Sequence, residues 1–387
     1  MSVERYATKT GDQWMVRYRD LLHQPKKVRG FATKKDAQKW ERDTLTAMAG
    51  GTYTDPNVGR RTVGEIAPRF FAIHPAKPAT IARYESAWRV RVERQWGSVP
   101  VRNVRVSDVK EWVRAMELDG RSAATIGSAL DVLSGVMALA VEDRLIPANP
   151  VPEVTRPTRQ RKRRNYLDHG QVARLADECG ASFAPYGLVV RVLAYTGLRF
   201  GELSALRAGD FDAARRRLRV RDGATEVKGR RFVGTTKTGG ERSVPVPDFL
   251  VPALVEQTKG RLPDAWLFAG PMGAPLSVQR FRARAWRRAL LHLRRADPSF
   301  PYVTPHDLRH SAASLAVSAG ANVKVLQRML GHDRATTTLD TYADLLGTDL
   351  DDVAARMSAA ATAAASAPKP PARMPRNRVV GAPDVPK

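Results

Sequence analysis

Apolar and polar side chains alternate at the start of the chain, as they do in a strand with one buried face. Residues 13–19 show this alternation, and a second, basic strand is predicted over residues 27–31. Thr33 stands where it can cap a helix, and Gly50-Gly51 begins a break in the pattern. We therefore predict that residues 1–58 form a separate module made of a small β-sheet and one helix.

Helical periodicity replaces the alternation between residues 62 and 150. Apolar residues recur there at steps of three and four, which predicts a core-facing stripe on each helix. Pro147 and Pro150 end the pattern. The predicted helix starts are Thr62, with Glu65 in capping-box spacing, Thr80, Ser107 and Ser122. This region is thus predicted to be an all-α bundle.

Residues 166–353 mix helical periods with short strands, which predicts a mainly α domain of the mixed α+β type. Strands are predicted over residues 217–220, 231–235 and 242–246, and the last two flank Lys237-Thr238-Gly239-Gly240, a sequence typical of a hairpin turn. Helices are predicted over residues 168–179, 185–196, 277–293, 305–318, 323–330 and 336–343. Residues 354–387 are rich in Ala and Pro, which predicts a disordered tail on this multidomain chain.

A basic linker, residues 151–165, joins the two larger domains. Six of the nine positions from 156 to 164 are Lys or Arg and none is acidic. Like charges and prolines disfavour a compact helix, so an extended segment is expected. The segment is either a solvated tether or a strap that lies along phosphates. In the second case the DNA-binding candidates are Arg161, Lys162, Arg163 and Arg164.

Arginines surround an apolar stripe on the predicted helix 277–293. The stripe consists of Phe281, Ala285, Ala289 and Leu293, which follow one another at four-residue steps. Arg280, Arg284 and Arg287 lie around it and are further DNA-binding candidates. A solvated basic face explains the same pattern equally well.

The net charge of the chain predicts a polyanionic partner. The 387 residues include 64 Lys and Arg against 39 Asp and Glu, a formal net charge of +25. Nucleic acid is the first candidate and an anionic membrane the second, but the longest apolar stretch, residues 129–141, is too short to cross a bilayer. The single Cys179 excludes an intramolecular disulfide and a thiolate metal cluster. Without a signal-peptide core at the N-terminus, we expect a cytoplasmic, DNA-bound protein.

A small set of side chains between residues 199 and 342 could act together on a phosphate. Arg199 lies at a helix start, which is an anion site, and Glu202 could hold its guanidinium from the same helical face. His306 and Arg309 project together from one helix. Each residue alone has an ordinary explanation as a salt bridge, a cap or packing. The full set is Arg199, Lys237, His306, Arg309, His332 and Tyr342, with Glu202 in a supporting place.

This set resembles the active-site pattern of the tyrosine recombinase (phage integrase) family. The resemblance extends over residues 62–350 and is carried by the motifs Thr196–Leu203, Thr236–Pro247, His306–His310, Leu330-Gly331-His332 and Thr341-Tyr342. Residues 1–50 also resemble the arm-binding domain of lambda-type integrases. The resemblance implies an arm-type DNA-binding domain at 1–58, a SAM-like core-binding domain at 62–150 and a catalytic domain at 166–353.

The chemistry of phosphodiester cleavage fits these residue types. Arg199 and Arg309 can clamp the non-bridging phosphate oxygens, where charge concentrates in the transition state. The family implies that Tyr342 is the nucleophile, that a 3′-phosphotyrosyl intermediate forms, and that Lys237 protonates the leaving oxygen. We expect His306 to be the base. His332 is expected either to hydrogen-bond the phosphate or to support His306 as the base. His310 and Asp307 are interpreted as packing and helix-capping residues. Neither a metal nor another cofactor is needed.

The resemblance also implies partners. Double-stranded attachment sites are the expected substrate, a homotetramer on DNA the expected assembly, and a host bending factor and an excisionase are compatible with it. Two enzymatic alternatives stay open, a type IB topoisomerase and a transposon-encoded recombinase. The non-enzymatic alternative is a basic architectural DNA-binding protein.

Overall fold

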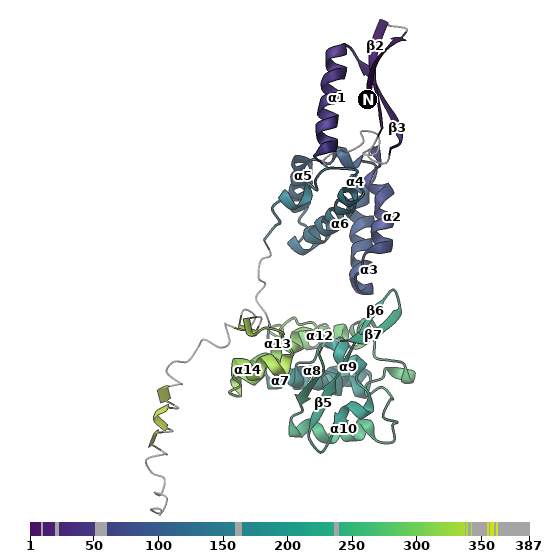
Figure 1. Ribbon diagram of the computed structural model, residues 1–387. Coiled ribbons are helices and arrows are strands. Elements are labelled where there is room, and N and C mark those ends of the chain that lie inside the picture. The colour runs from purple at the N-terminus through teal and green to yellow at the C-terminus, as the bar shows by residue number, and fades with distance from the viewer. Residues whose placement is uncertain are drawn as a thin grey trace, which may run out of the picture. The chain divides into compact units, whose positions relative to one another are not determined.

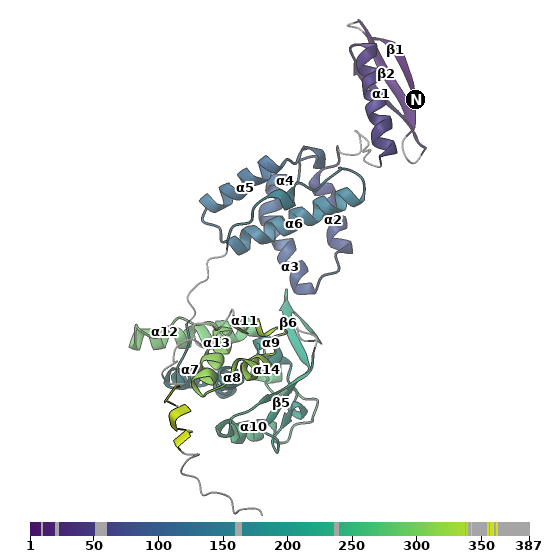
Figure 2. The same cartoon turned by 60° about the vertical axis from the view of Figure 1, so that its left-hand side comes forward.

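The computed structural model describes most of the chain and divides it into two compact units. One unit contains residues 1–163 and 224–233, and the other contains residues 164–223 and 234–387 (Figures 1 and 2). The described residues are 1–8, 11–19, 23–50, 60–158, 165–235, 240–336, 338–339, 342, 354–355, 357–359 and 361–362.

The N-terminal module is an antiparallel sheet covered by one helix (Figure 2). Strands β1 (Ser2–Thr8), β2 (Gly11–Arg19) and β3 (Pro25–Phe31) pair in that order, and α1 (Lys34–Ala49) packs on β2. Strand β1 was not predicted, whereas the cap is confirmed, since the Thr33 side chain accepts from the backbone N–H of Asp36 at 3.1 Å. Between sheet and helix, the ring of Tyr18 meets that of Trp40 edge-on at 5.4 Å.

A helical bundle follows, as predicted. Its helices are α2 (Val63–Ile73), α3 (Pro78–Ala87), which continues through a π-helical turn (Trp88–Val92) into α4 (Glu93–Trp96), then α5 (Val106–Leu118) and α6 (Ala123–Glu142). The Thr62–Glu65 capping box and the Ser122 cap are confirmed. The starts at Thr80 and Ser107 are wrong, because Pro78 begins its helix earlier and the Ser107 hydroxyl bonds Asp108 instead.

Helix α6 forms the centre of the bundle. It is the one helix among the described residues that is long and apolar enough to cross a membrane. Its apolar positions, among them Ile126, Leu130, Leu133 and Met137, are instead fully buried against the other helices. Helix α6 is therefore the core helix of the bundle.

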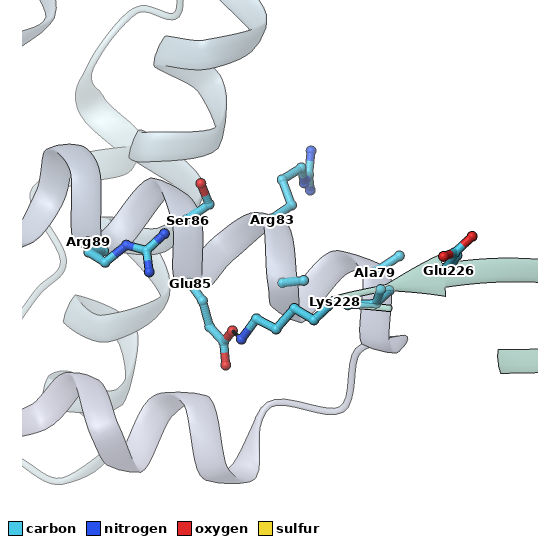
Figure 3. A pocket seen from close by; sticks show the side chains of 9 residues that line it. Ala79, Arg83, Glu85, Ser86, Arg89, Glu226 and Lys228 are labelled. Carbon is cyan, nitrogen blue, oxygen red and sulfur yellow. Dashed lines mark hydrogen bonds and ion pairs between the residues drawn. The ribbon is translucent and has the colours of Figure 1, made fainter. Parts of the chain in front are cut away.

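The tip of a β-hairpin belongs to the first unit. Strands β6 (Asp222–Val227) and β7 (Arg230–Thr235) pair with each other, joined by Lys228 and Gly229, which both have positive φ. Lys228 Nζ reaches Glu85 Oε2 on α3 at 2.7 Å, beside a shallow pocket (Figure 3). The predicted pairing of 231–235 with 242–246 is wrong, because the two-residue turn gives β7 a nearer partner.

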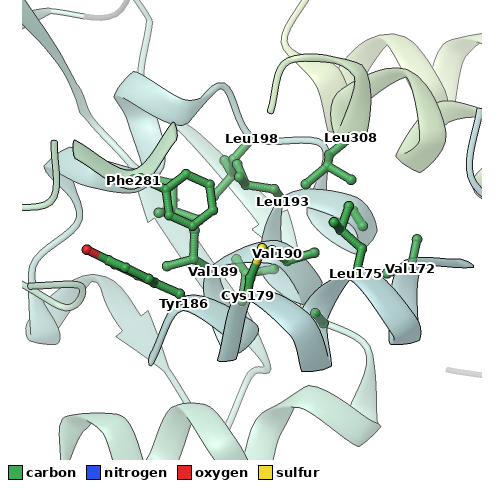
Figure 4. Close-up of a cluster of buried hydrophobic side chains, with 14 of the residues drawn as sticks. Val172, Leu175, Cys179, Tyr186, Val189, Val190, Leu193, Leu198, Phe281 and Leu308 are labelled. Atoms are coloured by element: carbon green, nitrogen blue, oxygen red, sulfur yellow. The ribbon is translucent and has the colours of Figure 1, made fainter. Parts of the chain in front are cut away.

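The second unit contains a small sheet and eight helices among its described residues, counting none in the tail. Strands β4 (Phe211–Asp212), β5 (Arg217–Val220) and β8 (Arg242–Pro245) pair in that order. The helices are α7 (His169–Ser182), α8 (Ala184–Thr196), α9 (Phe200–Ala205), α10 (Val251–Thr258), α11 (Val278–Phe281), α12 (Arg287–Ala296), α13 (Asp307–Ser318) and α14 (Val323–Leu330). Figure 4 shows the core, where α7 and α8 pack against Phe281 and Leu308.

The predicted basic helix over 277–293 is formed, with an irregularity. A π-helical turn, Arg282–Trp286, lies between α11 and α12. The apolar stripe of Phe281, Ala285, Ala289 and Leu293 is buried, as the helical periodicity indicates. Arg280, Arg284 and Arg287 are exposed around it.

The described part of the predicted disordered tail is helical and exposed. Residues 354–355, 357–359 and 361–362 carry helical backbone, and Thr362 donates to the carbonyl of Ser358 at 3.0 Å. Disorder is the wrong prediction for these residues, because their alanine-rich sequence favours a helix. The prediction for residues 363–387 lies outside the described residues.

Candidate active site

Arg199 is placed by a sharp turn between two helices. Helix α8 ends at Gly197, which has φ of 65°, and α9 begins directly after Arg199. Only glycine adopts this left-handed conformation without strain. A Cβ on Gly197 would also lie 2.6 Å from Leu330. The turn therefore fixes Arg199 at the start of α9, close to α14.

A buried carboxylate holds Arg199 in place. Glu202 is 2% exposed, and its Oε1 accepts from Arg199 Nη1 at 2.7 Å while its Oε2 accepts from the Arg199 backbone N–H at 2.9 Å. The supporting role predicted for Glu202 matches this geometry. The side chain of Arg199 remains 25% exposed, so its guanidinium can still meet a ligand.

A second arginine, Arg242 at the start of β8, completes the network and was missed by the sequence analysis. Its Nη1 and Nη2 donate to the two oxygens of Glu202 at 3.1 and 2.6 Å. Burial raises the pKa of Glu202, but the hydrogen bond and charge of Arg242, with those of Arg199, outweigh it and leave the pKa lowered. Glu202 therefore stays ionised between two arginines.

Arg242 also lies under the turn that carries His332. Gly331 ends α14 with φ of 66°, and a Cβ there would lie 2.8 Å from both Cδ and Nε of Arg242. The missing side chain lets the guanidinium stem pass below the turn. Arg242 thus touches both the Arg199–Glu202 pair and the Gly331–His332 turn.

Arg309 lies deeper than Arg199. It is 3% exposed, and its Nη1 and Nη2 donate to the carbonyl oxygens of Gly197 and Leu330 at 2.7 and 2.6 Å. Burial, with the neighbouring charge of Arg199, lowers the pKa of Arg309 to about 10. The guanidinium remains charged near neutral pH and ties the α8 turn to the end of α14.

His332 is half-buried beside these arginines. Its Nδ1 lies 2.9 Å from Thr338 Oγ1, and its ring stacks on that of Tyr342 with centroids 6.4 Å apart. Burial, and then the charges of Arg309, Arg199 and Arg242, lower the pKa of His332 to about 4. The imidazole is therefore neutral under physiological conditions.

Tyr342 is shielded from solvent. It is 1% exposed and packs among Ala313, Leu326 and Leu330. Its hydroxyl lies 2.9 Å from Nδ1 of His310. The interpretation of His310 as a packing residue is wrong, because the side chain next to Arg309 on α13 faces the tyrosine hydroxyl.

The other predicted site residues are placed as follows. His306 is exposed at the start of α13, and its ring meets that of His310 edge-on at 5.3 Å. Asp307, the first residue of α13, accepts from the backbone N–H and the hydroxyl of Thr304, three residues earlier. Lys237, Arg161, Lys162, Arg163 and Arg164 lie outside the described residues.

The arrangement is a cationic site with a phenol at its edge. Arg199 and Arg242 bond the carboxylate of Glu202, and Arg309 adds a third positive charge, so these described residues together carry more positive than negative charge. The described residues contain no group of three or more His, Cys, Asp or Glu side chains that could hold a metal ion. Such a site is suited to a phosphate group, with guanidinium donors for its oxygens.

The chain is similar in sequence to known integrases. The model of the phage integrase family matches residues 165–347. The chain is 31% identical over 339 residues to an integrase of Mycobacterium phage FRAT1, covering 84% of this chain and 98% of the relative, and 29% identical over 346 residues to that of Mycobacterium phage D29, covering 85% and 89%.

Two solved structures share the fold. The Tn1549 transposon integrase in complex with a circular intermediate DNA matches with a TM-score of 0.64 at 24% identity, covering 77% of this chain and 99% of that one. A lambda integrase tetramer bound to a Holliday junction matches with a TM-score of 0.58 at 20% identity, covering 86% and 96%.

Proposed function

The chain belongs to the phage integrase family of tyrosine recombinases, enzymes that cleave and rejoin DNA, and we propose that it is a site-specific integrase. It integrates or excises a phage or another mobile element through a 3′-phosphotyrosyl bond to Tyr342. The observation that supports this most directly is the contact between the Tyr342 hydroxyl and Nδ1 of His310, which are 2.9 Å apart. His310 is the neighbour of Arg309, and the same unit holds the Arg199–Glu202 ion pair.

In the proposed reaction the arginines bind the scissile phosphate. Arg199 and Arg309 donate to its non-bridging oxygens, and Arg242 keeps Arg199 aligned through Glu202. The Tyr342 oxygen attacks phosphorus, the bond to the 5′ oxygen breaks, and Lys237 supplies the proton that this oxygen needs. His332, neutral beside the arginines, binds a phosphate oxygen. The phenol is buried in the described state, so the phosphate must gain access to its hydroxyl before attack.

We propose that the exposed arginines around the apolar stripe of α11 and α12 form the surface that binds the DNA duplex. Arg280, Arg284 and Arg287 would contact phosphates there. The linker residues Arg161, Lys162, Arg163 and Arg164 would add a basic strap. Substituting Arg280, Arg284 and Arg287 should weaken binding to all sequences alike and reduce its salt dependence.

The proposal extends to partners and place. A lambda integrase tetramer bound to a Holliday junction supports assembly of four copies on two duplexes. The attachment sites are double-stranded DNA, the compartment is the cytoplasm of the host cell, and a bending factor and an excisionase would assist. The similarity to phage integrases over most of the chain favours a prophage-type element over a topoisomerase or a binding-only protein.

Covalent trapping tests the chemistry. The full chain is incubated, without metal or ATP, with nicked suicide duplexes from the DNA that flanks its own gene. We expect a denaturation-resistant adduct that maps to Tyr342, and binding without an adduct for Tyr342→Phe. An adduct that persists in Tyr342→Phe would refute the assignment of the nucleophile. Tight binding without any adduct on these duplexes would favour the architectural alternative.

The N-terminal module carries the proposed second DNA contact. Its sheet presents basic residues on β2 and β3, and α1 covers its other side. Deleting residues 1–50 should abolish binding to a distal arm site and leave adduct formation at the core site intact. Equal affinity for the distal site after the deletion would refute the arm-binding role.

A further inference from the structure

The proposed reaction needs a base that receives the proton of Tyr342. A phenol has a reference pKa of about 10, so its oxygen needs an acceptor for the proton at neutral pH. Because Tyr342 is 1% exposed, bulk water cannot be that acceptor in the described state. We propose that His310, rather than His306, takes the proton of Tyr342 and returns it when the strand is rejoined. This inference rests on the proposed function.

The contact that carries the inference is direct. His310 Nδ1 lies 2.9 Å from the Tyr342 hydroxyl oxygen, a distance at which a proton can pass along a hydrogen bond. The two rings are inclined by 60° with centroids 5.7 Å apart, so the imidazole meets the hydroxyl with its edge. Helix α13 fixes the position of His310 because Arg309, its neighbour, is held by two carbonyl oxygens.

The other two histidines are less suited to receive the proton. His332 stacks parallel to the Tyr342 ring, with 12° between the planes, and its Nδ1 faces Thr338. His306 is exposed, and its ring stands edge-on to that of His310. In the proposed reaction His306 contacts the phosphate, while His310 serves the nucleophile.

The proposed step balances as follows. In cleavage the Tyr342 oxygen bonds to phosphorus, the bond from phosphorus to the 5′ oxygen breaks, and the phenolic proton moves to Nδ1 of His310. Nδ1 must therefore start unprotonated, with the ring proton on Nε2. In rejoining, the 5′ oxygen attacks, the tyrosine oxygen leaves, and the His310 imidazolium returns the proton. A change at His310 should consequently slow both half-reactions.

His310→Asn is the sharpest variant. Its amide can occupy the place of Nδ1 and keep a hydrogen bond to the tyrosine, but it cannot accept a proton at neutral pH. Adduct formation on the suicide duplex should slow roughly 100- to 10,000-fold, the usual contribution of a general base. The affinity for the duplex should stay within about twofold of wild type, because His310 faces the phenol rather than DNA.

The chain provides a matched control. His169 Nδ1 lies 2.8 Å from the hydroxyl of Tyr195 on the surface of the same unit, so His169→Asn changes the same kind of pair away from the site. This variant should form the adduct at the wild-type rate. Equal loss in both variants would mean that unfolding, not chemistry, explains the effect, and would overturn the inference.

A tyrosine analogue separates proton acceptance from ring placement. Ring-fluorinated tyrosine ionises at lower pH than tyrosine. Placing it at position 342 should raise the rate of adduct formation in His310→Asn by at least about tenfold and leave the rate in the otherwise wild-type protein unchanged. Absence of this rescue would show that His310 only positions the ring. A wild-type rate in His310→Asn would return the role to His306. If wild type itself forms no adduct, the proposed function fails instead.

Discussion

Replacing Glu202 by Gln should test whether the buried carboxylate holds the catalytic unit together. Glu202 accepts four hydrogen bonds from Arg199 and Arg242, at 2.6 to 3.1 Å. Glutamine removes the charge and turns one acceptor into a donor that faces guanidinium N–H groups. Breaking a buried pair costs about 3–5 kcal/mol. We expect about 3 kcal/mol, since both arginines keep some exposure with which to recover water.

The control is a surface pair of the same spacing. Arg114 and Glu117 on α5 also lie three residues apart, with Nη1 and Oε2 at 3.2 Å, but both side chains are exposed. Glu117→Gln should therefore change stability by less than about 0.5 kcal/mol. The two variants alter the same Arg-x-x-Glu pattern, so burial is the difference that separates them.

Hydrogen exchange in increasing urea is the suitable assay, because a chain with two units need not unfold in one step. Peptides from α8 report the second unit, and peptides from α6 in the first unit are an internal reference. Glu202→Gln should lower the protection of α8 and leave that of α6 unchanged. A loss below about 0.5 kcal/mol in α8 would refute the argument that Glu202 anchors this unit.

The same variant predicts a pH dependence. The pKa of Glu202 is lowered in the fold below its ordinary value of 4.5, so its ionised form is favoured by folding. Its contribution is fully present above about pH 4.5 and is lost as the pH falls through the lowered value. The difference between wild type and Glu202→Gln should therefore shrink below pH 4.5. A difference that stays constant there would contradict the assignment.

Three further changes have defined outcomes. Gly331→Ala should cost about 1–2 kcal/mol for the left-handed backbone and displace Arg242, slowing adduct formation; an unchanged rate would argue against that contact. The pKa of His332 falls from 6.5 to about 4 on folding, so the free energy of unfolding measured in urea should decrease as the pH is lowered between these two values. His332→Gln should remove this pH dependence. Gly135→Ala puts a Cβ 2.4 Å from the Phe70 ring, so overpacking of about 1–3 kcal/mol should exceed the helix gain and lower the melting temperature.

Local signals in the sequence predicted much of the fold. Thr33, Thr62 and Ser122 cap helices within three residues of themselves, so their neighbours in the sequence are enough to identify them. Ser107 fails for an equally local reason, since its hydroxyl has Asp108 as a nearer partner. The apolar stripe around Phe281 was predictable because helical periodicity alone decides which face is buried.

Partners that lie far apart in the sequence were not predictable in the same way. Strand β8 pairs with β5 rather than with the preceding β7, and no period in the sequence encodes that choice. Arg242 bonds Glu202, which lies 40 residues earlier in the sequence. The residues around Arg242 indicate only the start of a basic strand. His310 was assigned to packing because its partner, Tyr342, lies 32 positions further on.

The site is therefore assembled from pairs that only folding brings together, and these pairs share members. Arg242 bonds Glu202, which bonds Arg199, and passes under the Gly331 turn that positions His332. Arg309 spans from the Gly197 turn to the end of α14 in the same way. A displacement of α14 would consequently move His332 and loosen Arg309 together. Since Tyr342 packs on the same helix, its exposure to a phosphate should be coupled to the arrangement of the arginines that bind that phosphate.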